Sequence, residues 1–175
     1  MNEKNFTDLF RFSRIYEKST KSINKSDPLG VFAHQALDNI SYDLQKFLAK
    51  HSLNEYFTTS HCQGAPSMPR ITWVSVIVPR TRVSHEPSYT ICFGRAGLGL
   101  VHGLMLPSKI NWPNLSPTIR EKTEHFINID GTKSDLKYNN RYINPQEIYA
   151  DNFNIEKLLS HLIESLTILR SLKIN

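Results

Sequence analysis

The sequence is poor in features that define several classes of protein. It has only two cysteines, Cys62 and Cys92, among 175 residues, so a disulfide framework is not predicted. No Cys/His spacing typical of a zinc finger occurs. No apolar run approaches the roughly 18 residues of a membrane span, and the first residues, MNEKNFTDLFRF, lack the apolar core of a signal peptide. We therefore expect a cytoplasmic protein that does not contact a membrane.

Signatures of catalysis are also scarce. The seven histidines include no HExxH pair, and no GxxxxGK[ST] phosphate loop is present. Asp130 and Asp135 beside Lys137 offer carboxylates for magnesium, although the neighbouring Gly131 makes a turn the simpler interpretation. We expect no catalytic activity from this chain alone, no cofactor and no bound metal. A magnesium-dependent nuclease at Asp130–Lys137 is the alternative.

Acidic residues are almost missing from one stretch, Tyr56–Arg120, where Glu86 is the only one. The bases there are Arg70, Arg80, Arg82, Arg95, Lys109 and Arg120, so six minus one gives +5, which equals the net charge of the whole chain. Localised positive charge favours binding of a polyanion such as nucleic acid. Basic side chains that neutralise phosphates release the counterions bound there, and this release favours binding. The predicted phosphate contacts are Arg70, Arg80, Arg82 and Arg95.

Composition and periodicity predict one α+β domain. A hydrophobic content of 39% and a charged content of 21% are typical of globular chains. Apolar residues at helical spacing predict helices over Phe6–Tyr16, Leu29–Leu48 and Asn154–Lys173, the last with a leucine stripe and Asn154 as its cap. Ser116 and Pro117 predict a further short helix through Phe126. Strands are predicted at Ile71–Val78, Ser88–Phe93 and Leu98–Leu106.

The expected architecture is a twisted, half-barrel-like antiparallel sheet flanked by N-terminal helices and a long C-terminal helix. In this single DNA-recognition domain the helical part spans 1–55, the sheet and loops span 56–115, and the C-terminal helices and loop span 116–175. The last helix has a spacing near 3.6 rather than a strict heptad, which predicts packing on the sheet rather than a coiled coil.

Aromatic residues lie within the basic stretch. Tyr89 and Phe93 are four positions apart on one predicted strand and so share a face, which Trp73 of the neighbouring strand could join. These rings form either a pocket for one nucleic-acid base or the core of the sheet. The pocket is favoured because the helices contain enough Leu, Ile and Val to build a core without them.

The predicted loop Ser60–Ser67 combines small residues with a single glutamine. Gly and Ser allow a backbone to approach a sugar-phosphate chain closely. Gln63 is long enough to enter a groove or to fill the gap left by an extruded base. An ordinary glycine turn is the alternative and, from these residues alone, the favoured one.

Four motifs occur in a characteristic order: SHCQG at 60–64, Trp73 opening an apolar strand, SYTICF at 88–93 and LKYNNRY at 136–142. Over Ser60–Leu169 this order resembles the amino-terminal DNA-binding domain of McrB-type modification-dependent restriction enzymes. The chain departs from the family pattern at Cys62 and Thr72, where glycine and proline are usual, and Phe93 stands where some members have a smaller aliphatic residue.

The resemblance implies recognition of 5-methylcytosine in duplex DNA by base flipping. It implies pocket walls from Trp73, Tyr89, Phe93 and Tyr138, and a groove loop of His61, Cys62, Gln63 and Gly64 with Gln63 at the inserting position. The chain would then be the targeting module of a restriction system for phage defence, fused to or associated with a GTPase motor and a nuclease subunit.

Other functions stay open at this point. The chain could be a sequence-specific DNA-binding subunit or the nuclease subunit of a restriction system. It could also bind RNA or single strands, with the aromatic face stacking unpaired bases.

Overall fold

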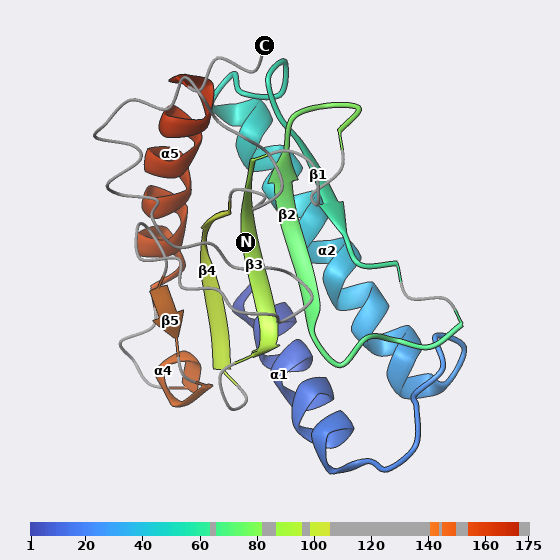
Figure 1. Ribbon diagram of the computed structural model, residues 1–175. Coiled ribbons are helices and arrows are strands. Elements are labelled where there is room, and N and C mark those ends of the chain that lie inside the picture. The colour runs from blue at the N-terminus through green and yellow to red at the C-terminus, as the bar shows by residue number, and fades with distance from the viewer. Residues whose placement is uncertain are drawn as a thin grey trace.

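The computed structural model describes residues 1–63, 66–81, 87–95, 99–105, 141–143, 145–149 and 154–171. Its helices pack on an antiparallel sheet, which confirms the predicted α+β class with N-terminal helices and a C-terminal helix (Figure 1). The helices are α1 (Glu3–Lys18), α2 (Pro28–Lys50), α4 (Pro145–Tyr149) and α5 (Ile155–Ser171). The strands are β1 (Thr58–His61), β2 (Thr72–Ile77), β3 (Ser88–Arg95), β4 (Gly99–Met105) and β5 (Arg141–Ile143).

The sheet is a meander in which each strand pairs with the one before it. Its order is β1-β2-β3-β4-β5, and every neighbouring pair is antiparallel. Strand β1 includes Ser60 and His61, which the sequence analysis assigned to a loop. The segment Thr58–His61 carries no apolar alternation, so only its pairing with β2 reveals it as a strand. Within the described ranges, no helix has the length and apolar character needed to cross a membrane.

Local chemistry explains where the helices begin. The Asn2 side chain accepts a hydrogen bond from the Lys4 N–H at 3.0 Å, and Pro28 stands in the first turn of α2. The Asn154 side chain accepts from the Glu156 N–H at 2.8 Å, so the predicted cap of the last helix is confirmed.

The register of β2 and β3 assigns their side chains to two faces of the sheet. Trp73 lies opposite Cys92, whereas Phe93 lies opposite Thr72. Directly paired residues project to the same side and successive residues alternate, so Trp73 projects from one face and Tyr89 and Phe93 from the other. The prediction that Tyr89 and Phe93 share a face is confirmed, but the expectation that Trp73 joins them is wrong. We call the side with Trp73, Ser75, Thr90 and Cys92 the Trp73 face.

The other side, with Tyr89, Ile91 and Phe93, is the helix-covered face. Phe93 packs on Phe6 and Phe10 of α1, with ring centroids 5.6 and 5.8 Å away. Ser41 of α2 donates a hydrogen bond to the Thr59 hydroxyl at 2.8 Å, and His161 of α5 lies 5.0 Å from the His102 ring. The leucine stripe of α5 is buried, as predicted for core packing, at Leu158, Leu162, Leu166 and Leu169. Three helices therefore pack on this one face.

Gly94 permits β3 to pass close to two other segments. Its φ is +83°, and a Cβ there would lie 2.9 Å from the Arg70 carbonyl oxygen and 3.1 Å from the Ser13 hydroxyl. The pairing of β3 with β4 also shifts register between Phe93 and Arg95. Glycine at this irregularity therefore allows α1 and the segment before β2 to approach the strand.

Candidate functional site

Gln63 and Trp73 lie at the same end of the sheet. The Cys62 N–H donates to the Trp73 carbonyl oxygen at 3.1 Å, and the Trp73 N–H lies 3.5 Å from the Cys62 Sγ. The indole is partly buried against the core, whereas Gln63, the next residue after Cys62, is exposed. A long amide side chain and a partly covered aromatic ring are thus neighbours at this end, which we call the Gln63 end.

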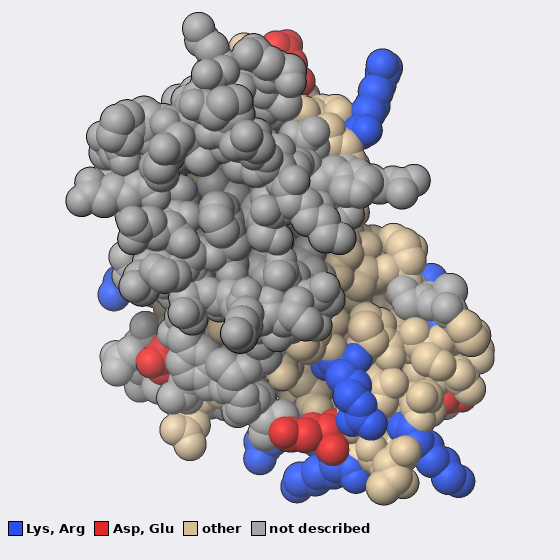
Figure 2. All heavy atoms as spheres, viewed as in Figure 1, with Lys and Arg blue, Asp and Glu red and all other residues tan. Residues whose placement is uncertain are grey.

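The segment after α1 brings positive charge to the Gln63 end. The Lys25 N–H donates to the Pro66 carbonyl at 2.8 Å, and the Met68 N–H donates to the Ile23 carbonyl at 2.8 Å. Lys21 is exposed and Lys25 is half-buried. Figure 2 shows Lys and Arg side chains gathered at the lower edge of the molecule, where Figure 1 places the end of α1 and the turn after it.

Sequence reasoning missed this basic segment. The signal was present, since residues 11–26 hold five bases, Arg11, Arg14, Lys18, Lys21 and Lys25, against the single acid Glu17. This signal was hidden because acidic residues elsewhere outside Tyr56–Arg120 balance these basic residues in the summed charge. Only the pairing of residues 23–25 with residues 66–68 brings the charge beside the loop that contains Gln63.

Arg70, predicted as a phosphate contact, has an intramolecular role. Its guanidinium donates to the carbonyl oxygens of Tyr16 at 2.8 Å and Ser19 at 3.1 Å, and lies 4.7 Å from the centroid of the Tyr16 ring. These carbonyls belong to the end of α1, where a cation is favourable because of the helix dipole. Two of its donors are therefore engaged within the chain, while Arg70 remains exposed, so its contact with phosphate stays a prediction.

The other predicted arginines do not gather at the Gln63 end. Arg80 is exposed with a φ of 66° and follows the far end of β2. At about 3.3 Å per residue it lies on the order of 20 Å along the chain from Trp73. Arg82 lies outside the described residues, as does the side chain of Arg95.

The predicted four-residue pocket does not form among the described residues. Tyr89 and Phe93 are both 0% exposed on the helix-covered face, away from Trp73. Phe93 belongs to the core because α1 covers it. For this ring, the core interpretation is therefore correct and the favoured pocket interpretation is not. Tyr138 and Gly64 lie outside the described residues, as do Asp130, Asp135 and Lys137.

Tyr89 instead belongs to a buried polar cluster with two histidines. Its hydroxyl hydrogen-bonds the Nδ1 of His102, whose Nδ1 lies 3.4 Å from the Nδ1 of His161. All three residues are buried, and they come from β3, β4 and α5. The sequence offered no signal for this cluster, because His102 and His161 are 59 residues apart and match no motif.

Cys62 is a buried, free thiol. Burial raises its pKa from 9.0 to about 11. A raised folded pKa means that the neutral thiol stabilises the fold fully below pH 9 and loses this contribution as pH rises toward 11. Cys62 is therefore a weak nucleophile at neutral pH and is not a catalytic candidate.

We predict that this thiol affects alkaline stability. Relative to Cys62→Ala, the wild-type chain should lose up to about 3 kcal/mol more of its free energy of unfolding between pH 9 and pH 11. Urea denaturation of both proteins at several pH values measures this difference, and other alkaline titrations cancel in it. Parallel pH profiles for the two proteins would contradict the prediction.

Three potential metal ligands meet beside the Gln63 end. His34 Nδ1 lies 3.1 Å from the Asp38 Oδ2, and His61 Nε2 lies 2.9 Å from the Asp38 Oδ1. Burial lowers the pKa of His61, and the Asp38 carboxylate opposes that shift. Two of the three ligands could have been noticed in the sequence, because His34 and Asp38 have an H-x-x-x-D spacing on the second helix. His61 could not, because it lies in the segment that was expected to be a loop.

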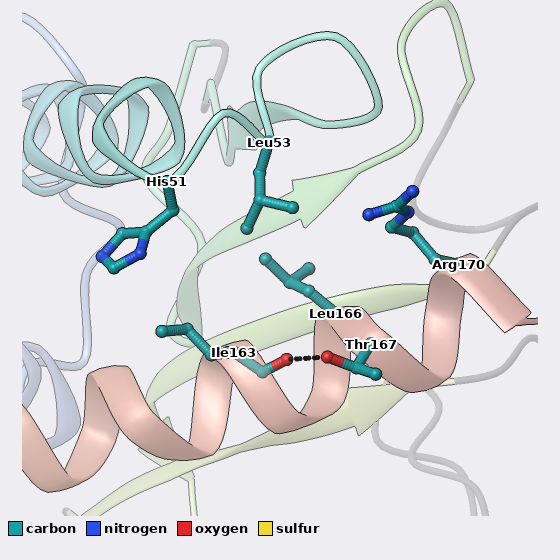
Figure 3. A pocket seen from close by; sticks show the side chains of 6 residues that line it. All are labelled: His51, Leu53, Ile163, Leu166, Thr167 and Arg170. Carbon is teal, nitrogen blue, oxygen red and sulfur yellow. Dashed lines mark hydrogen bonds between the residues drawn. The ribbon is translucent and has the colours of Figure 1, made fainter.

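A separate pocket of about 470 Å³ lies at the opposite end of β1 (Figure 3). It is lined by His51, Leu53, Ile163, Leu166, Thr167 and Arg170. The Thr167 hydroxyl donates to the Ile163 carbonyl at 2.9 Å, and the Arg170 guanidinium lies 4.1 Å from the Tyr56 ring centroid. Because these polar groups already have partners within the chain, the pocket offers little specific recognition.

The chain matches no protein-family model, no curated protein and no solved structure in comparisons of sequence and fold. Function is therefore inferred from the residues and geometry of this chain.

Proposed function

We propose that this chain binds duplex DNA and recognises a modified cytosine by flipping the base out of the helix. The observation that carries the proposal is the Gln63 end, where exposed Gln63, partly buried Trp73 and Lys25 lie together, with the exposed Lys21 four residues before Lys25. The resemblance to McrB-type domains supports it, because that resemblance assigns the inserting position to Gln63 and an aromatic wall to Trp73.

The components of this end have complementary roles. The lysines hold the phosphate backbone without reading sequence, while Gln63 fills the gap that the flipped base leaves. Unstacking a base costs a few kcal/mol, and stacking on Trp73 returns about 1 to 3 kcal/mol. A buried methyl group contributes only about 0.8 kcal/mol, so discrimination also requires a close fit around the 5-position.

The Trp73 face is the proposed base-binding surface, in place of Tyr89 and Phe93. Buried hydroxyl groups follow Trp73 along it. Ser75 Oγ lies 2.7 Å from Thr90 Oγ1, which lies 3.1 Å from Ser88 Oγ. These hydroxyl groups are at most 2% exposed and bond one another, so on this face the proposal rests on the partly exposed Trp73 ring.

In this role the chain is a targeting module without activity of its own. It would direct a GTPase motor and a nuclease subunit to modified DNA, either as partners or within one polypeptide. We expect it to act in the cytoplasm.

The test is fluorescence anisotropy with one short duplex that carries cytosine, 5-methylcytosine or 5-hydroxymethylcytosine, at two salt concentrations. We expect tighter binding to one modified duplex and weaker binding to all three at higher salt. Equal affinity for the three duplexes would contradict base recognition. Tighter binding to a single strand would favour the RNA or single-strand alternative, and cleavage of plasmid with magnesium would favour the nuclease.

Charge reversal at the basic segment tests the phosphate contacts. Lys21→Glu with Lys25→Glu should weaken binding to all three duplexes alike and reduce the slope of log affinity against log salt by about 0.9 per lost contact. The matched control is Lys46→Glu with Lys50→Glu, which changes the same charge on exposed residues near the other end of α2. Equal losses in both double variants would show that only overall charge matters.

A further inference from the structure

Two secondary-structure elements bring three metal-binding side chains together. His34 and Asp38 are one turn apart on α2, so they share a face of the helix. His61 is the last residue of β1 and reaches the same carboxylate. The ring centroids of His34 and His61 are 5.3 Å apart with an interplanar angle of 72°.

We propose that His34, Asp38 and His61 form a zinc-binding site. One ligand atom from each residue lies within 4.8 Å of the other two. Bonds of about 2.0 to 2.2 Å in a tetrahedral zinc site place neighbouring ligand atoms about 3.3 Å apart. The observed distances of 3.1 and 2.9 Å to the Asp38 oxygens need little adjustment to reach that geometry. In the zinc-bound state, metal bonds replace the contacts between the imidazoles and the carboxylate.

The donor set selects the class of metal. Two imidazole nitrogens and one carboxylate suit zinc and similar transition ions, whereas magnesium and calcium prefer sites made of oxygen alone. Three protein ligands leave a fourth position for water. The Gln63 Nε2 lies 3.3 Å from the His61 Nε2. Rotating the Gln63 amide by a half turn exchanges its nitrogen and oxygen, which brings the oxygen near the fourth coordination position.

Burial favours a preformed site with one open side. The side chains of His34 and His61 are only 16% and 12% exposed, while that of Asp38 is 53% exposed. Packing therefore restricts both imidazoles, and the ion can enter past the carboxylate. The bound ion would join α2 to the end of β1 and hold Gln63 close to it. The zinc site does not depend on the DNA-binding proposal.

The experiment is calorimetric titration of the full chain with Zn²⁺ after treatment with EDTA, together with the absorption spectrum of the Co²⁺ complex. We expect one ion per chain, a higher melting temperature with zinc and the visible bands of four-coordinate cobalt. Asp38→Asn and His61→Gln should each weaken binding by at least about 10- to 100-fold, the loss typical of removing even an outer partner of a metal ligand.

His51→Gln is the matched control, because it removes an exposed histidine just after α2 and should leave binding unchanged. Circular dichroism establishes that each variant is folded, and His34→Gln provides a second ligand variant if one fails to fold. The site is refuted if folded wild-type protein shows no saturable binding, if the ligand variants bind as tightly as wild type, or if His51→Gln is equally impaired. No DNA is present, so this result is independent of the test of DNA recognition.

Discussion

Phe93→Ala should lower the free energy of unfolding by about 3 to 5 kcal/mol, the range for removing a buried aromatic ring. Phe93 is 0% exposed and contacts Phe6 and Phe10 of α1. Its loss leaves a cavity between the sheet and the first helix. Urea denaturation followed by circular dichroism measures the loss.

The control for this effect is Ile15→Ala, which removes a side chain that is 41% exposed on α1. We expect it to cost much less, because 41% of that residue already contacts water, whereas Phe93 is fully buried. If Phe93→Ala kept full stability and instead removed a preference for modified DNA, Phe93 would be part of a base pocket, as the resemblance implied.

Trp73→Ala should remove the preference for modified DNA while leaving weak, salt-sensitive binding. Loss of about 1 to 3 kcal/mol of stacking corresponds to roughly 5- to 150-fold in affinity. The remaining binding comes from the lysines, which contact phosphate and do not read the base. The measurement is the same anisotropy titration with modified and unmodified duplexes.

Two variants accompany this test. Trp73→Phe keeps an aromatic face and should retain part of the preference. Tyr89→Phe removes the hydroxyl that bonds His102 on the helix-covered face, and so should leave the preference intact. Survival of the preference in folded Trp73→Ala, or its loss in Tyr89→Phe, would place the base on the other side of the sheet.

The helices and most strands could be predicted because their signals are local. The leucine spacing of α5 and the cap at Asn154 predicted one helix closely, and β-rich runs bounded by proline and glycine predicted β2, β3 and β4. Strand β1 was missed because Thr58–His61 has no such pattern and exists through its pairing with β2. The bonds from Arg70 to carbonyl oxygens at the end of α1 could not be predicted, because composition records its charge but not its partners.

The sequence by itself determined the α+β class and the shared face of Tyr89 and Phe93, because the periods of helix and strand fix which side chains of one element point together. Tertiary structure decided that this face is the core and that Trp73 projects from the other one. It also brought His61 to His34 and Asp38, and the basic segment to Gln63. Strand register and helix packing join residues that are distant in the chain, so no local pattern specifies them.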